Sequence, residues 1–159
     1  MPRKQPLDYA FSLLELRDRS TGEIRRKMQQ KGYLEVEINA AVERLSELDF
    51  LNDRRFAESY LRAQLGIRPR GRFELQAKLR QLYLPEDLIM ETLEGYGSEA
   101  EEVQAREAAR RWLSRKSDLP PPEQREKLAR FLAGRGFGWE VIKRTLDQML
   151  SVKDQNGKG

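Results

Sequence analysis

The feature that most constrains the fold is an apolar pattern that recurs three times along the 159-residue chain. Shifting the sequence by 51 residues superposes one set of apolar residues on a second, and a shift of 104 residues adds a third. Each set holds two pairs of residues four positions apart with a turn between them, which is typical of two amphipathic helices. The sets are Ile24, Met28, Tyr33, Ile38 and Val42; Leu75, Leu79, Leu84, Ile89 and Leu93; and Leu128, Leu132, Phe137, Ile142 and Leu146.

A further helix is predicted in front of each pair. Shifts of 47 and 99 residues align Leu13 with Tyr60 and Trp112. In the first repeat, helices are expected at residues 7–17, 21–31 and 35–48. Coincidence is the alternative, since apolar residues recur every three or four positions in any helical chain, but the shared order of three stripes and a turn favours a repeat.

We therefore predict an all-α protein of three tandem three-helix repeats. Their expected bounds are residues 1–51, 52–97 and 98–152, followed by a disordered tail at 153–159. A unit of about 50 residues buries too little surface to be stable alone, so neighbouring repeats must share apolar surface. The prediction is an elongated, curved array.

Several helix ends have local signals. Ser20 and Glu23 have the spacing of a capping box, and Gly32 suits the left-handed residue that ends a helix. Asp53 is predicted to cap the first helix of the middle repeat, and a second capping box is predicted at Ser98 to Glu101. Consecutive prolines predict an extended, stiff link at residues 118–122.

Composition narrows the function. The chain has no cysteine and no histidine, which removes disulfides, thiol nucleophiles and the commonest general base and transition-metal ligand. No glycine-rich phosphate loop is present. These absences disfavour an enzyme and predict neither a metal nor a cofactor. No long apolar run or signal-peptide pattern occurs, so the expected location is the cytoplasm, away from membranes.

Basic residues are the main candidates for binding. The net charge is +4, and the cations concentrate on the first and second helices of each repeat and on the loops that join them, while the third helices are acidic. This pattern predicts a basic face for phosphates or an acidic partner, although a solvated, ion-paired surface is the plainer alternative. The candidates are Arg25, Arg26, Lys27 and Lys31; Arg68, Arg70, Arg72, Lys78 and Arg80; and Arg110, Arg111, Arg115, Arg130 and Arg135.

The loop from Arg68 to Arg72 is the strongest of these candidates. Its three arginines alternate with Pro69 and Gly71, and the one carboxylate near them is Glu74. Functional binding is favoured over solvation here. Aromatic residues at helical spacing, by contrast, are predicted to pack in the core rather than to stack on bases; they are Tyr60, Trp112, Phe131 and Phe137.

Particular motifs resemble the RecX family, bacterial regulators of the RecA recombinase. The matching stretches are residues 13–20, 23–28, 31–33, 51–60, 130–132 and 135–137, with Phe56, Ala57 and Tyr60 at the core of the most recognisable motif. The resemblance implies tandem three-helix units that bind in the groove of the RecA filament on DNA. It also implies inhibition of ATP hydrolysis, strand exchange and co-protease activity, by blocking filament growth or promoting disassembly, in DNA repair and the SOS response.

Two other function classes stay open. One is an autonomous DNA-binding helical protein without sequence specificity, since the second helices offer Arg and Lys for phosphates but few Asn or Gln for base edges. The other is an enzyme that uses carboxylates and lysines. The leading prediction is a monomeric, non-enzymatic regulator that binds the RecA filament and inhibits RecA strongly. Its binding to single- or double-stranded DNA is predicted to be weak and salt-sensitive.

Overall fold

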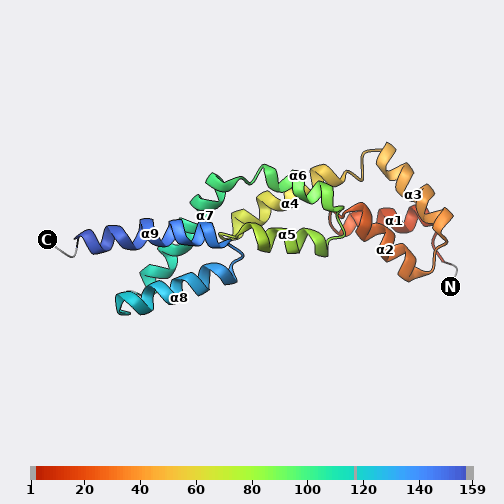
Figure 1. Cartoon of the computed structure of the whole chain (residues 1–159). Helices are drawn as coiled ribbons and strands as arrows, with labels where there is room; N and C mark the ends of the chain where they lie inside the picture. Colours follow the sequence, from red (N-terminus) through yellow and green to blue (C-terminus); the bar gives the residue numbers. More distant parts are fainter. Residues whose placement is uncertain (1–2, 117, 157–159) are drawn as a thin grey trace. The chain divides into compact units, whose positions relative to one another are not determined.

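The computed structural model describes residues 3–116 and 118–156, and within them the chain forms nine α-helices and no strand (Figure 1). The predicted all-α repeat fold is confirmed. The helices are α1 (Pro6–Leu16), α2 (Thr21–Lys31), α3 (Glu35–Glu47), α4 (Asp53–Ile67), α5 (Arg72–Gln81), α6 (Glu86–Glu94), α7 (Ser98–Arg115), α8 (Pro121–Gly134) and α9 (Trp139–Asn156).

By its internal contacts the chain groups into two compact units. Unit 1 comprises Met1–Tyr60 and Lys78–Thr92, and unit 2 comprises Leu61–Ala77 and Leu93–Gly159. In unit 1, α1, α2 and α3 contact one another, and in unit 2, α7, α8 and α9 do the same (Figure 1). Residues of the predicted middle repeat are divided between the units. The repeat bounds therefore stay a prediction, although the boundaries after residues 51 and 97 both fall in loops.

The apolar residues that defined the repeat form the cores. All fifteen positions of the three superposed sets are buried, and eight of them are completely inaccessible. Burying a side chain of this size stabilises the fold by about 1.5–3 kcal/mol. One cluster holds Ala10, Leu13, Ala41, Leu45 and Leu51 with the first set, and another holds Ala105, Ala108, Ala109, Val141 and Leu150 with the third.

The predicted ends of α2 are confirmed. The Glu23 backbone N–H donates to Ser20 Oγ at 3.1 Å, and the Ser20 N–H donates to Glu23 Oε1 at 3.1 Å, which completes the capping box. Gly32 ends the helix with φ of 94°, a left-handed conformation that glycine adopts at little cost.

The corresponding turn of the middle repeat keeps this conformation without a glycine. Tyr83 lies 51 residues after Gly32 and has φ of 59°. A left-handed conformation costs a non-glycine residue about 1–2 kcal/mol. The exposed Tyr83 ring lies against Arg26, whose guanidinium carbon is 4.9 Å from the ring centroid, and this contact offsets part of that cost.

Two predicted caps are wrong, because the side chains have other partners. Asn52 caps α4, since its Oδ1 accepts the Arg55 N–H at 3.0 Å. Asp53 instead accepts the backbone N–H of Thr21 at 2.7 Å. At α7 the N-cap is Gly97, with no side-chain hydrogen bond, so Ser98 does not form the predicted capping box.

The proline-rich link is also shorter than predicted. Pro121 and Pro122 lie in the first turn of α8, where a missing N–H leaves no helical hydrogen bond unmade. Pro120, with φ of −57° and ψ of 146°, is extended as expected. At the other end, α9 is helical as far as Asn156, and the last three residues of the predicted tail lie outside the described part.

Candidate functional site

The basic loop from Arg68 to Arg72 is held mainly by contacts inside unit 2. Arg68 donates to Glu74, with Nη2 2.5 Å from Oε1. Arg70 is only 5% exposed; its Nε donates to the Gln64 carbonyl oxygen at 3.1 Å, and its Nη1 lies 3.2 Å from Glu74 Oε1. The two arginines thus share one carboxylate.

Arg72 also turns to internal acceptors. Its Nη1 donates to the carbonyl oxygen of Leu93 at 2.9 Å. The Tyr96 hydroxyl donates to the Arg70 carbonyl oxygen at 2.5 Å, and burial raises the pKa of this hydroxyl, so it stays a donor. The loop was predicted to bind RecA or DNA, and in the structure the side chains of Arg70 and Arg72 are held by internal acceptors. Either side chain would lose these contacts on turning towards a phosphate.

The same arrangement occurs in unit 1, at positions 51 residues earlier. Arg17 pairs with Glu23 through both of its terminal nitrogens, as Arg68 does with Glu74. The Nε of Arg19 donates to the Leu13 carbonyl oxygen at 3.1 Å, the same distance and position as the Arg70 bond. The two loops therefore share a motif, R-x-R-x-x-x-E, from 17 to 23 and from 68 to 74.

The motif precedes a helix N-terminus that lies against a turn from the next repeat. In unit 2 a Cβ on Gly71 would lie 2.1 Å from the carbonyl carbon of Gly136, and the Gly71 N–H donates to the Arg135 carbonyl oxygen at 2.8 Å. In unit 1 a Cβ on Gly22 would lie 2.3 Å from the Tyr83 carbonyl oxygen. We name these contacts the first junction (unit 1) and the second junction (unit 2).

A carboxylate from the first helix of the following repeat caps each junction. Asp53 accepts the N–H of the first residue of α2, Thr21. Glu101 does the same for the first residue of α5, Arg72, at 2.6 Å. A carboxylate at a helix N-terminus is favoured by the helix dipole and by the unpaired N–H groups. These acids, missed as junction residues from the sequence, explain why both predicted caps failed.

The sequence did contain a signal for this motif. Its two copies lie 51 residues apart, which is the shift that superposes the first repeat on the second. The third repeat lacks it: a shift of 104 residues brings Pro121, Glu123 and Lys127 to the positions of Arg17, Arg19 and Glu23. The motif thus occurs in the first and second repeats and is absent from the third.

Basic residues of α2 have weaker contacts. Arg25 donates to Asn39 Oδ1 at 2.7 Å, and the Lys31 ammonium lies 5.9 Å from the Tyr9 ring centroid. Arg26 lies over Tyr83, as described above. Lys27 is exposed, and within the described residues it makes no ion pair. These side chains are accessible to a partner.

On α5 the two candidates differ. Arg80 is exposed and pairs with Glu86, with Nε 2.9 Å from Oε2, and this hydrogen bond raises the pKa of the guanidinium. Lys78 is half-buried. Both side chains are more exposed than that of Arg70.

Unit 2 carries the remaining candidates on α7 and α8. Arg110 and Arg111 both bind Glu107, at 2.7 and 3.0 Å, and the bond to Arg110 is the main reason that the pKa of Glu107 falls to about 2. Arg130 pairs with Glu126 at 2.8 Å on an exposed surface. These pairs are solvent-exposed and contribute little to stability, so a phosphate could replace their carboxylates.

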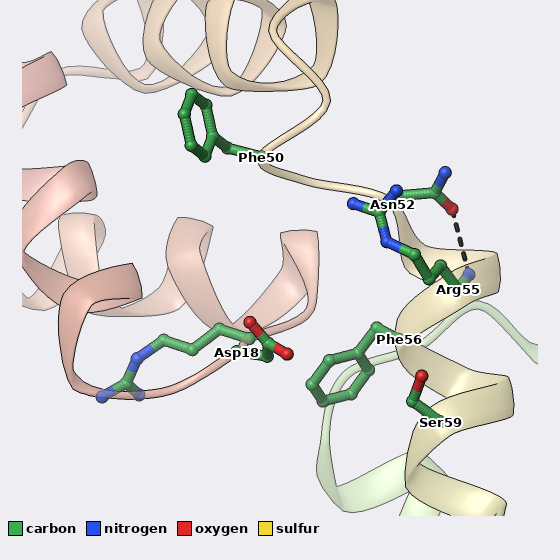
Figure 2. Close-up of a pocket in the computed structure, with 7 residues that line it drawn as sticks. Asp18, Phe50, Asn52, Arg55, Phe56 and Ser59 are labelled. Carbon is green, nitrogen blue, oxygen red and sulfur yellow. Dashed lines mark hydrogen bonds between the residues drawn. The ribbon is translucent and has the colours of Figure 1, made fainter.

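Two cavities adjoin the junctions. At the first junction, a cavity of about 100 Å³ lies between the loop before α2 and the start of α4 (Figure 2). Figure 2 shows Phe50 and Phe56 at its sides, with Asp18 and Arg55 from facing segments. At the second junction, a cavity of about 210 Å³ is lined by Arg68, Arg111, Trp112, Arg115, Phe131 and Arg135, among others.

The family-motif residues have mainly packing contacts. Ala57 is completely buried, and the Phe56 and Tyr60 rings stack with centroids 6.2 Å apart. Among the other predicted core aromatics, Phe137 is buried. Trp112 and Phe131 are half-buried: both pack against the core cluster of unit 2, as predicted, and both also border the second cavity.

Neither a membrane span nor a metal cluster was found in the part of the chain that the structure describes. None of its helices combines the length and apolarity needed to cross a bilayer. In the same residues, no group of three or more acidic side chains is placed to hold a metal ion.

Comparison with known proteins gives one consistent family. The models of the first, second and third three-helix domains of RecX match residues 7–45, 52–93 and 100–146. The chain is 33% identical to the regulatory protein RecX of Prosthecochloris aestuarii over 93% of its length and 95% of that protein. It is 35% identical to the regulatory protein RecX of Chlorobaculum tepidum, over 93% of the chain and 90% of the relative.

A solved structure shows the same fold. The crystal structure of RecX from Lactobacillus salivarius superposes with a TM-score of 0.84, covering 92% of this chain and 95% of that one, at 22% identity. The sequence matches extend over all three predicted repeats and over nearly the full length of the relatives. The chain therefore belongs to the RecX family.

Proposed function

We propose that this protein regulates the RecA recombinase by binding in the groove of the RecA–DNA filament. The observation that carries the proposal is the match to proteins named regulatory protein RecX along nearly the whole chain. Binding there blocks filament growth or promotes disassembly, and so lowers ATP hydrolysis, strand exchange and co-protease activity. The regulator acts as a cytoplasmic monomer through binding alone, without a catalytic step or cofactor.

The basic residues are proposed to make the filament contact. Lys27, Arg110 and Arg130 are exposed, and their internal contacts are absent or limited to surface ion pairs within the described residues. Such side chains exchange an internal carboxylate for a phosphate or an acidic protein group at little cost. Contacts to phosphate carry no sequence information, so the proposed DNA binding is non-specific, weak and sensitive to salt.

The test is ATP hydrolysis by RecA filaments on single-stranded DNA, with the purified protein added. We expect inhibition that rises with protein concentration. No change in hydrolysis or in filament length would overturn the proposal. Binding to DNA without any effect on RecA would instead support an autonomous DNA-binding protein.

A matched pair of variants tests the basic face. The variant K27A/R110A/R130A removes three exposed cations from second and first helices, and R44A/K143A/R144A removes three exposed cations from third helices. We expect the first to inhibit more weakly and with a smaller dependence on salt, since each lost phosphate contact lowers the salt slope by about 0.7–0.9. Equal inhibition by the two variants would reject the proposed face.

A further inference from the structure

The cavity at the second junction combines two half-buried aromatic rings with a lining that, unlike that of the first cavity, holds four arginines and no carboxylate. The Trp112 and Phe131 rings lie with centroids 6.4 Å apart and planes inclined by 31°. The guanidinium of Arg135 lies 5.1 Å from the Phe131 centroid. Flat groups thus surround a space bordered by α7, the end of α8 and the loop before α5.

Charge around this cavity is strongly positive. Its lining holds four arginines and no carboxylate. Glu74 and Glu107 are the acids that pair with lining arginines, and each is shared with a further arginine outside the lining. Among the described residues no carboxylate pairs with Arg115 or Arg135. Six guanidinium groups therefore face two carboxylates.

We propose that this cavity binds one unstacked base of a single-stranded nucleic acid. The base stacks on Trp112 and Phe131, and the phosphates on either side of it bind Arg115 and Arg135. Single-strand binding sites combine these elements, an aromatic face for the base and cations for the backbone. The volume of about 210 Å³ is below the roughly 300–1,000 Å³ of pockets for drug-sized ligands, which suits a single base.

The first junction shows why the inference is confined to the second. A shift of 51 residues places Asp18 where the second cavity has Pro69, which puts a carboxylate into the first lining. Arg55 of that lining is bound to Asp49 at 2.7 Å, and the hydrogen bond to Arg55 lowers the pKa of Asp49. The first cavity is also about half as large. The two cavities therefore differ in charge and size, although they lie at equivalent positions in the repeat.

An acidic peptide is the competing ligand. It would satisfy the arginines, but its carboxylates have no flat apolar surface for Trp112 and Phe131. A nucleotide satisfies both groups with one ligand. For this reason we favour nucleic acid and use the peptide as a control.

Trp112 makes the test direct, because Trp112 and Trp139 are the chain's two tryptophans. Trp139 is 67% exposed, so we expect Trp139→Phe to leave the fold intact, with Trp112 as the single tryptophan. We expect an oligothymidine of about ten nucleotides to quench this emission at low salt. An abasic strand with the same number of phosphates is expected to quench it much less. An oligoglutamate peptide is expected neither to quench it nor to displace the strand.

Two variants, read by the anisotropy of labelled oligothymidine, locate the site. Loss of base stacking in Trp112→Leu should weaken binding by about 5- to 150-fold, the equivalent of 1–3 kcal/mol. R115A/R135A should lower the salt slope by about 1.4, two single-strand phosphate contacts. The control R125A/R144A removes two exposed arginines of unit 2 that lie away from the cavity, and should change neither value.

Several outcomes would overturn the inference. Equal quenching by the abasic strand would show phosphate binding without a base, and displacement by oligoglutamate would show a site for acidic peptide. Unchanged Trp112 emission during binding would place the DNA elsewhere. The inference rests on the DNA contact within the proposed function, but its test contains no RecA, so its failure would leave inhibition of RecA standing.

Discussion

Arg70→Ala is the substitution that best separates a structural from a ligand-binding role for the basic loop. The Arg70 side chain is 7% exposed and makes two charged contacts, to the Gln64 carbonyl oxygen and to Glu74. Alanine removes both and leaves the Gln64 oxygen without this donor. Glu74 is 18% exposed and keeps Arg68, so it does not become an unpaired buried charge.

The expected loss of stability follows from these contacts. A hydrogen bond to a charged group contributes about 1.5–3 kcal/mol, and breaking a fully buried ion pair costs about 3–5 kcal/mol. Glu74 keeps its ion pair with Arg68 and is partly exposed to solvent, so the cost should be below that of breaking a fully buried ion pair. We expect the free energy of unfolding to fall by about 2–4 kcal/mol, with Tm lower by about 2–4 °C for each kcal/mol.

Urea denaturation followed by tryptophan fluorescence measures the stability of unit 2, which contains Arg70. Both tryptophans belong to unit 2, as does Arg70, and unit 1 contains none. Circular dichroism reports both units. Arg19→Ala is the matched control: it loses the same bond to a backbone carbonyl in unit 1, and no carboxylate of the described residues pairs with it. Its expected cost is about half as large, and it should appear in circular dichroism.

Refutation would take a clear form. If Arg70→Ala unfolded at the same urea concentration as the parent protein while binding DNA or RecA filaments more weakly, the loop would be a ligand site. An equal loss in Arg70→Ala and in the exposed Arg125→Ala, whose ion pair contributes about 0–1 kcal/mol, would also contradict the argument.

Two further predictions concern local geometry and pH. Gly71→Ala should destabilise unit 2 by about 1–3 kcal/mol, because its Cβ would lie 2.1 Å from a backbone carbon of the α8–α9 turn; Gly66→Ala, in α4 with no atom within 4 Å, should stabilise the protein by about 0.5–1 kcal/mol in the same urea assay. The pKa of Glu107 is lowered to about 2, so its contribution to stability is present above its unfolded pKa of about 4.3 and is lost as pH falls through 2. An NMR titration of its carboxyl carbon that gave an ordinary pKa would contradict this.

Local features of the sequence predicted helices and their apolar faces well. The stripe from Ile24 to Val42 and its two copies became the buried cores, because a residue's face on a helix depends only on spacing along the chain. The Ser20 cap and the Gly32 turn formed for the same reason, since their partners lie within one helical turn. In the middle repeat, Tyr83 takes the place of Gly32 and has the same left-handed conformation.

Predictions failed where a side chain's partner came from another part of the chain. Asp53 and Ser98 both had the local spacing of caps. The carboxylates at Asp53 and Glu101 bind helix N-termini about 30 residues earlier, and no window of one helical turn contains both groups. Pro121 lies in the first turn of α8, although the proline run predicted an extended link. The first turn of a helix tolerates proline because its backbone N–H groups have no helical partner.

The sequence by itself determined the secondary structure, the buried set, the repeat and the family, because each depends on spacing or on similarity along one chain. Only the tertiary structure decided what the arginines do. A guanidinium reaches several ångströms in any direction, and its partner depends on what the fold brings near it. In the fold, Arg70 binds Glu74 and a backbone oxygen, whereas Arg115 and Arg135 line a cavity together with the Trp112 and Phe131 rings.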